Sequence, residues 1–248
     1  MLADIWTVMW KEWHEILHQS GSIRATLLNQ LLVVILIAIS FSLPVGREWL
    51  ETAASLQLWC LLPMLLVTTT IPDSFAGERE RHTLETLLAS RLSESAILLG
   101  KIGAAVSYAC GLTLLAGLLS MASINIMNWD GTLHFYSRGV FLAGMGASLL
   151  TATLVASLGV FVSVRAATVR QAQQSLGLAI FVLATLPLIG FSDLFSLPRA
   201  WKASLATILT AASSTQIFLI AVLLMVVLDL ILITAAMRRF KRTQLILD

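Results

Sequence analysis

The chain has 248 residues, of which 58% are hydrophobic and only 12% are charged. A soluble domain carries about 25% charged residues, because its surface must remain hydrated. The low charged fraction excludes an ordinary soluble globule, a disordered chain and a disulfide scaffold. The formal net charge of +2 indicates no partner by itself. The composition therefore predicts an integral membrane protein.

Residues 1–20 have the pattern of an amphipathic helix. Apolar residues recur there at helical spacing, whereas Asp4, Lys11 and Glu15 fall on the opposite face. Three tryptophans lie in the same stretch, and tryptophan favours the lipid headgroup region. We therefore expect an interfacial helix in the inner membrane surface. The alternative is an ordinary cytoplasmic helix packed on a partner.

Six apolar runs follow, each long enough to cross a hydrocarbon layer, which takes about 20 residues. They cover residues 23–43, 53–75, 95–124, 139–164, 171–191 and 214–237. The runs are continuously apolar and lack the alternation of barrel strands, so they predict helices. Ser93 is predicted to cap the third helix, with Glu94 at its positive end. The expected fold is an all-α integral membrane protein, with six transmembrane helices in a single transmembrane domain over 1–248.

The distribution of basic residues predicts the orientation. If the N-terminus is cytoplasmic, twelve of the 16 basic residues fall in cytoplasmic segments, and Arg47, Arg138, Arg199 and Lys202 fall outside. The twelve are Lys11, Arg24, Arg79, Arg81, Arg91, Lys101, Arg165, Arg170, Arg238, Arg239, Lys241 and Arg242. This bias follows the positive-inside rule and places both termini in the cytoplasm.

The stretch over residues 72–93 is the most informative in the chain. It combines the charges Glu78, Arg79, Glu80, Arg81 and Glu85 within eight residues. An apolar stripe of leucines at positions 84, 87, 88 and 92 follows at helical spacing. Closely spaced charges of alternating sign can offer directed ion pairs to a partner surface. A solvated loop helix that merely marks the membrane boundary remains the alternative.

The string FAGERERHTLETLL, residues 75–88, resembles the cytoplasmic segment of permeases of the ABC-2 family. That segment forms the coupling helix, which sits in a groove of the ATP-hydrolysing subunit. The resemblance implies a coupling helix over 76–92. The coupling residues that it implies are Glu78, Arg79, Glu80, Arg81, Thr83, Leu84 and Glu85. His82 stands where the family often has glycine, so we expect the local turn to be made differently here.

The order of elements extends this resemblance along the whole chain. Six spans, an interfacial N-terminal helix and a coupling segment between the second and third spans resemble the type V exporter fold. Residues 192–213 are too polar to span the membrane and too apolar for a free loop. The resemblance implies a re-entrant external hairpin there, before the last span. A plain external connection is the alternative.

The sequence contains no nucleotide-binding loop, because Gly100–Lys101 lacks the upstream glycine of a phosphate-cradling motif. We therefore predict that the chain is not an enzyme and binds no cofactor. ATP and Mg would be bound by a separate ATPase subunit. His14 and His18 share a helical face, but the sequence offers no further ligand nearby, and we predict no metal site.

Three polar residues are candidates for an intramembrane or pathway role: Asp229, Gln57 and Asp73. A charged residue within a span is costly and is often functional. Hydrogen bonding between helices is the simpler interpretation of these residues.

These observations predict a permease subunit of an ATP-driven ABC-2-type exporter. The resemblance implies two ABC ATPase subunits and a second permease copy or a relative, and the spans imply contact with membrane lipid but not nucleic acid. We expect a multi-pass protein of a prokaryotic inner or plasma membrane. One alternative is a secondary transporter driven by an ion gradient, with Asp229 as the ion site. Another is a non-transporting scaffold that recruits partners through residues 78–81.

Overall fold

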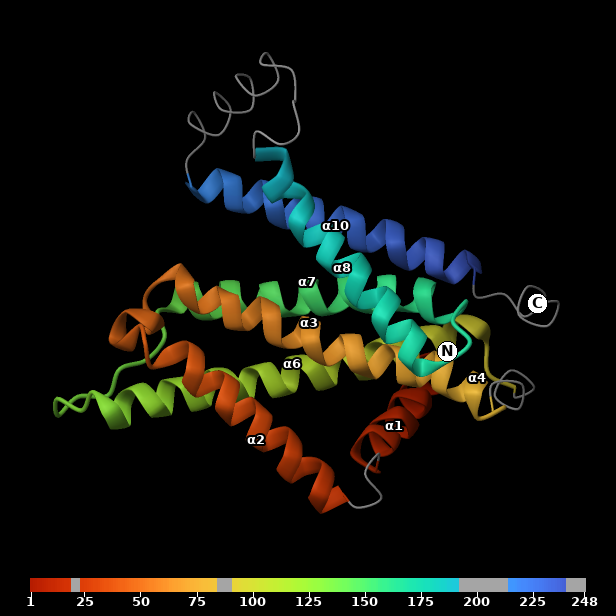
Figure 1. Ribbon diagram of the computed structural model, residues 1–248, viewed down its shortest axis with the longest axis horizontal. Coiled ribbons are helices and arrows are strands. Elements are labelled where there is room, and N and C mark those ends of the chain that lie inside the picture. The colour runs from red at the N-terminus through yellow and green to blue at the C-terminus, as the bar shows by residue number, and fades with distance from the viewer. Residues whose placement is uncertain (19–22, 84–90, 192–213, 240–248) are drawn as a thin grey trace, which may run out of the picture.

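The computed structural model describes residues 1–18, 23–83, 91–191 and 214–239. All regular structure in these residues is helical (Figure 1). The elements are α1 (Leu2–His18), α2 (Ile23–Ser42), η1 (Gly46–Leu50), η2 (Ala53–Ser55), α3 (Leu56–Pro72), η3 (Asp73–Gly77), α4 (Glu78–Glu80), α6 (Glu94–Met127), α7 (Arg138–Ser163), α8 (Val169–Phe191) and α10 (Ser214–Arg239).

Each of the six apolar runs in the sequence coincides with a helix. Three helical stretches in the described residues are long and apolar enough to cross a membrane: Ala53–Glu80, Glu94–Met127 and Arg138–Ser163. The predicted cap of α6 is confirmed, because the Ser93 side chain accepts a hydrogen bond from the backbone N–H of Ala96 at 3.3 Å. The protein is therefore an all-helical membrane protein. The expected hairpin over 192–213 lies outside the described residues.

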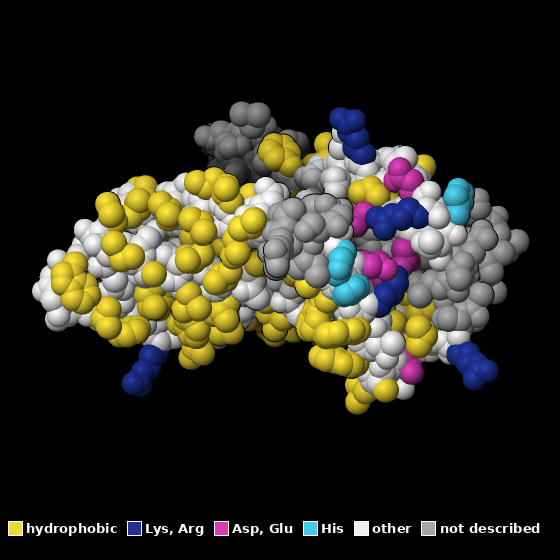
Figure 2. Space-filling view, turned by 90° about the horizontal axis from the view of Figure 1, so that it is seen from below, with side chains coloured by type: hydrophobic (Ala, Val, Ile, Leu, Met, Phe, Trp, Pro, Cys, Tyr) yellow, Lys and Arg dark blue, Asp and Glu magenta, His cyan; other side chains and the backbone are white. Residues whose placement is uncertain are grey.

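Helices α3, α6 and α7 run lengthwise beside one another and form the centre of the bundle (Figure 1). α2 packs on α6, and α10 packs on α7. The largest buried cluster joins α3, α6, α7 and α8 through apolar residues that include Val67, Ile71, Ile97, Val155 and Leu176. On the face shown in Figure 2, hydrophobic side chains cover much of one half of the molecule, and charged side chains gather toward the other end. We call this end, which carries α1, α4 and the start of α6, the charged end.

Trp59 fixes the distances between the three central helices at the opposite end. Its ring is 1% exposed and lies directly on the backbones of Gly117 in α6 and Gly144 in α7. A Cβ atom would lie 2.8 Å from the ring at Gly117 and 2.7 Å at Gly144. Small residues at helix contacts allow such close approach in membranes, where packing replaces the hydrophobic driving force.

Helix α1 lies across the bundle at the charged end and packs on α6 (Figure 1). Val8 fits against Gly100 and Met9 against Gly103, and Trp13 Nε1 donates to the carbonyl oxygen of Ala104 at 3.1 Å. On another face of α1, the large side chains at positions 2, 6 and 10 are exposed. α1 is thus held firmly to α6 while it keeps an exposed apolar face.

Candidate functional site

The charged run of residues 78–81 is the direct extension of α3. After Pro72 the backbone forms one π-helical turn, η3, and then α4. Phe75 and Ala76 are buried in this turn, and Ala76 packs against the start of α8. Single π-turns inside helices are frequent at functional sites, because the extra residue re-aims the side chains that follow. Here the side chains that follow are the charges of α4.

The helix ends at a left-handed turn centred on His82. The N–H of Thr83 donates to the carbonyl oxygen of Glu78 at 2.9 Å, and the N–H of His82 donates to that of Arg79 at 3.0 Å. This pair of bonds is a Schellman cap, in which the residue after the C-cap has positive φ. His82 has φ of 57°. The prediction of a different turn is therefore wrong, because His82 itself adopts the conformation that glycine favours.

Within the expected coupling helix over 76–92, the structure thus places a turn at residues 81–82. Residues 76–80, the first part of the range 76–92, form the end of the extension of α3. Leu84 and Glu85 lie outside the described residues.

Glu78 does not face solvent. Its side chain is 6% exposed, and its Oε1 lies 2.6 Å from Lys11 Nζ and 2.9 Å from Lys101 Nζ. Lys101 Nζ is also 2.7 Å from Glu12 Oε1. The side chain of Lys101 is 0% exposed and that of Glu12 is 2% exposed. We call these four residues, Lys11, Glu12, Glu78 and Lys101, the buried ion network.

The turn between α3 and α4 completes the network. Lys101 donates to the carbonyl oxygen of Ser74 at 2.8 Å, so its ammonium has Glu12, Glu78 and Ser74 as partners for its three N–H groups. The Ser74 hydroxyl donates to Glu12. The ring centroid of Phe75 lies 5.3 Å from Lys101 Nζ, within cation–π range. A buried charge is tolerated only when paired and hydrogen-bonded in this way.

The protonation of the network follows from these contacts. Burial alone opposes ionisation of Glu12, but the ammonium of Lys101 and the hydrogen bonds from Lys101 and Ser74 outweigh it and lower the pKa of Glu12. Burial likewise opposes the charge of Lys11, but hydrogen bonding to Glu78 and the nearby carboxylates raise the pKa of Lys11. Glu12 and Lys11 are therefore both ionised at neutral pH.

Carboxylate oxygens of Glu12, Glu15 and Glu78 lie within 4.8 Å of one another. Clustered carboxylates are also typical of sites for hard cations. In this cluster, however, the ammonium groups of Lys11 and Lys101 already supply the compensating positive charge. The arrangement is that of a structural ion-pair network that joins α1, α4 and α6.

The remaining charges of the run lie on the outer side of the turn. Glu80 is exposed, and its Oε2 accepts a hydrogen bond from the N–H of Val169, the first residue of α8, at 3.1 Å. Arg81 is exposed and pairs with Asp73 at 2.9 Å. Arg79 is half-buried and Thr83 is exposed. The charged run is thus divided, with one residue anchored inside the bundle and its neighbours outside.

The three candidate intramembrane residues lie in separate places. Gln57 is exposed near the start of α3, and Asp73 follows the end of the same helix, at the charged end. Asp229 belongs to α10 and is 5% exposed. Its Oδ1 is buried, and no hydrogen-bond partner for it is found among the described residues.

The sequence patterns did not single out Glu12 and Lys101 as partners. Each residue nevertheless has a sequence feature that could have indicated its role. Lys101 falls inside the predicted span 95–124, and an ionisable residue at such a position suggests a functional role. Glu12 lies four residues from both Val8 and Ile16, which are the other buried residues of α1.

Long apolar helices with an anchored, charged turn at one end define a multi-pass helical membrane protein. This chain belongs to the ABC-2 type transporter family, whose model matches residues 3–187. The predicted family is thereby confirmed. The chain is also 25% identical over 140 residues to the ABC transporter permease protein NatB of Bacillus subtilis (strain 168). That match covers 52% of this chain and 36% of the relative, so it spans about a third of the relative's length.

Proposed function

We propose that the chain is the transmembrane permease subunit of an ATP-driven exporter. A separate ATPase subunit binds ATP and Mg, and its movements drive a substrate outward through the permease. Membership of the ABC-2 family and the similarity to a protein named a permease support this proposal. The charged end and both termini face the cytoplasm, as the positive-inside bias favours. All six long helices span the membrane in this proposal, α1 lies at the inner surface, and residues 192–213 form an external re-entrant hairpin.

The observation that carries the proposal is the anchoring of the charged turn. Arg79, Glu80, Arg81 and Thr83 provide an outer face for the ATPase. In this proposal Leu84 and Glu85, which lie outside the described residues, also act in coupling. Glu78 acts behind this face as a positioning residue, since its carboxylate is bonded to Lys11 and Lys101.

This anchoring gives the turn mechanical connections to four helices. α4 continues α3 without a break, Glu78 joins it to α1 and α6, and Glu80 joins it to the start of α8. A displacement of the outer face by the ATPase would therefore be transmitted to α1, α3, α6 and α8 together. Large apolar side chains are exposed on α2, α8 and α10. This surface is available to contact lipid and a second permease copy or a relative. Two ATPase subunits would then bind the permease pair.

The test is retention of the ATPase by a charge-reversed turn. Arg79→Glu and Arg81→Glu together reverse the positive charges of the outer face without touching the buried ion network. We expect the double variant to lose the ABC ATPase that co-purifies with the wild-type chain, together with permease-stimulated ATP hydrolysis. Arg47→Glu with Arg138→Glu, two exposed positions at the opposite end, is the matched control and should retain both.

Two results would contradict the proposal. One is a wild-type chain from which no ABC ATPase co-purifies. The other is full ATPase retention and stimulation in the Arg79 and Arg81 double variant, with its melting temperature unchanged.

A second candidate function is supported by Asp229. A carboxylate that is 5% exposed in an apolar helix, with Oδ1 lacking a hydrogen-bond partner among the described residues, is a suitable ion or proton site. In that case the chain would be a transporter driven by an ion gradient. Transport that persists without ATP and collapses with the proton gradient would favour this function over the exporter.

A further inference from the structure

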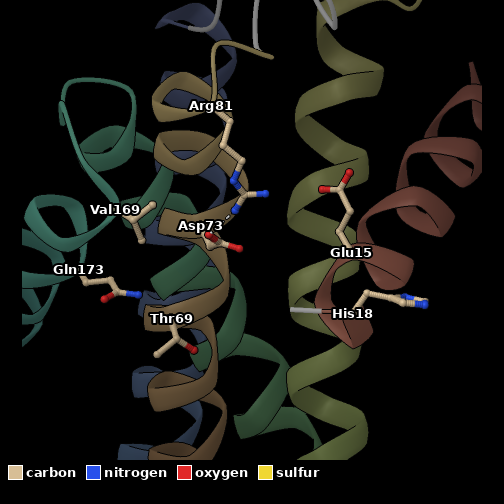
Figure 3. A pocket seen from close by; sticks show the side chains of 7 residues that line it. All are labelled: Glu15, His18, Thr69, Asp73, Arg81, Val169 and Gln173. Atoms are coloured by element: carbon tan, nitrogen blue, oxygen red, sulfur yellow. Dashed lines mark hydrogen bonds and ion pairs between the residues drawn. The ribbon is translucent and has the colours of Figure 1, made fainter. Parts of the chain in front are cut away.

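A polar cavity of about 570 Å³ opens at the charged end, next to the buried ion network (Figure 3). Helix α1 contributes Glu15 and His18 to its lining, and α8 contributes Gln173. Thr69 in α3, Asp73 in η3 and Arg81 after α4 complete the polar lining. The volume lies within the range of about 300–1,000 Å³ that is typical of small-molecule sites.

The cavity extends from the charged end into the bundle. Thr69 and Asp73 are four residues apart on one continuous helix, and Val169 and Gln173 are four residues apart on α8, so each helix lines the cavity over one full turn. Figure 3 shows Thr69 and Gln173 at the level farther from Arg81. These two residues belong to the apolar runs 53–75 and 171–191. The polar lining of the cavity therefore extends from the membrane boundary into the membrane-spanning parts of α3 and α8.

The charges of the lining have both signs. The guanidinium of Arg81 donates to Asp73 at 2.9 Å, and the carboxylate of Glu15 lies 3.1 Å from Lys11 Nζ. Figure 3 shows Arg81 and Asp73 on one side of the cavity and Glu15 on the other. A free phosphate would meet two carboxylates here, and a free cation would meet a guanidinium. A ligand with a phosphate next to an ammonium group satisfies both signs at once.

We propose that this cavity binds the headgroup of a zwitterionic phospholipid of the inner leaflet. Arg81 takes the phosphate, and the carboxylates of Glu15 and Asp73 take the ammonium group. The hydroxyl of Thr69 already donates to the carbonyl oxygen of Leu66 at 2.8 Å, so its oxygen is suited to accept from the ammonium. The Gln173 amide can donate to a phosphate oxygen. The placement at the inner leaflet rests on the orientation given in the proposed function.

The test measures lipid binding to the purified full chain without any ATPase, by native mass spectrometry from detergent. The probes are phosphatidylethanolamine and phosphatidylglycerol, which share the phosphate but differ in the ammonium, and soluble phosphorylethanolamine. We expect phosphatidylethanolamine to bind about tenfold more tightly than phosphatidylglycerol, as a charged hydrogen bond warrants. Glu15→Gln should reduce that preference, because only Asp73 is left to take the ammonium group, and Gln173→Leu should weaken the binding of both lipids. Asp4→Asn, on the same helix but outside the cavity, is the control and should change neither.

Three outcomes would overturn the inference. They are equal binding of the two lipids by the wild type, an unchanged preference in Glu15→Gln, and an equal loss in Asp4→Asn. Phosphorylethanolamine binding as tight as the lipid would assign the cavity to a soluble ligand and would also overturn it. A wild-type chain that shows no lipid preference but co-purifies with an ABC ATPase would refute only this inference. A wild-type chain that shows the preference but co-purifies with no ABC ATPase would refute only the proposed function.

Discussion

Replacing Lys101 by Met tests the buried ion network most directly. Lys101→Met keeps the length of the side chain but removes the charge that faces Glu12 at 2.7 Å and Glu78 at 2.9 Å. Both carboxylates would remain nearly fully buried, with only the half-exposed Lys11 to compensate them. Removing one partner of a buried ion pair costs about 3–5 kcal/mol. For a chain of this size, such a loss lowers the melting temperature by about 10 °C.

The assay is thermal unfolding of the purified chain, with hydrogen exchange of the backbone amides as the local readout. Exchange in α1 should accelerate more than exchange in α7, because the network attaches α1 to α6. Two controls accompany the variant. Lys11→Met removes a side chain that is 40% exposed and should cost less than about 1 kcal/mol. The triple variant Lys101→Met, Glu12→Gln, Glu78→Gln should recover most of the stability, because it leaves no buried unpaired charge.

A melting temperature of Lys101→Met within about 2 °C of the wild type would refute the reasoning. An equally large loss in Lys11→Met would also refute it, because burial would then not determine the cost.

The same network predicts how stability depends on pH. The pKa of Glu12 is lower in the folded chain than its usual value of about 4.3, so its contribution is complete above that pH and is lost as the pH falls through the folded value. The pKa of Lys11 is raised, so its contribution is complete below about pH 10.4 and is lost as the pH rises through the folded value. We expect a stability plateau between these limits. In Lys101→Met, measured across the same pH range, the decrease in stability at acid pH should be much smaller than in the wild type.

Three further variants test single contacts through the melting temperature. Gly144→Ala would drive a Cβ into the ring of Trp59 and should cost about 1–3 kcal/mol, whereas Gly146→Ala, with open space at its Cβ, should be neutral or stabilising. His82→Gly should stabilise the turn by about 1 kcal/mol, because left-handed backbone costs a residue with a Cβ about that much, and His82→Ala should give no such gain. Asp229→Asn should leave the melting temperature unchanged or raise it, because it removes a charge at a buried position.

Each of these expectations has a contradicting result. Equal effects at Gly144 and Gly146 would mean that contact with Trp59 does not determine the cost. An equal gain in the Gly and Ala variants of His82 would assign the effect to the lost imidazole instead of the backbone. A drop of several degrees in Asp229→Asn would mean that the carboxylate has a charged partner within the folded chain.

Much of the local structure could be predicted because it depends on local chemistry. A helix must satisfy its backbone hydrogen bonds within the segment, so a continuously apolar run of about 20 residues leaves few alternatives. The Ser93 cap was predicted for the same reason, since it needs only the hydroxyl and an amide three residues away. The charged string at residues 75–88 was sufficient to indicate the family. The turn at His82 was misjudged, because the preference of glycine for positive φ is strong but not absolute.

The sequence by itself thus determined the all-helical membrane class, the helix positions and the family. Only the tertiary structure decided which charges meet. Lys101 and Glu12 are 89 residues apart, and Lys11 and Glu78 are 67 apart, so no local pattern links them. The sequence made Glu78 one of several equivalent charges, whereas the fold buries it and leaves its neighbours outside. Long-range pairing depends on how the helices pack, and here the glycines of α6 let α1 approach closely enough for Glu12 to reach Lys101.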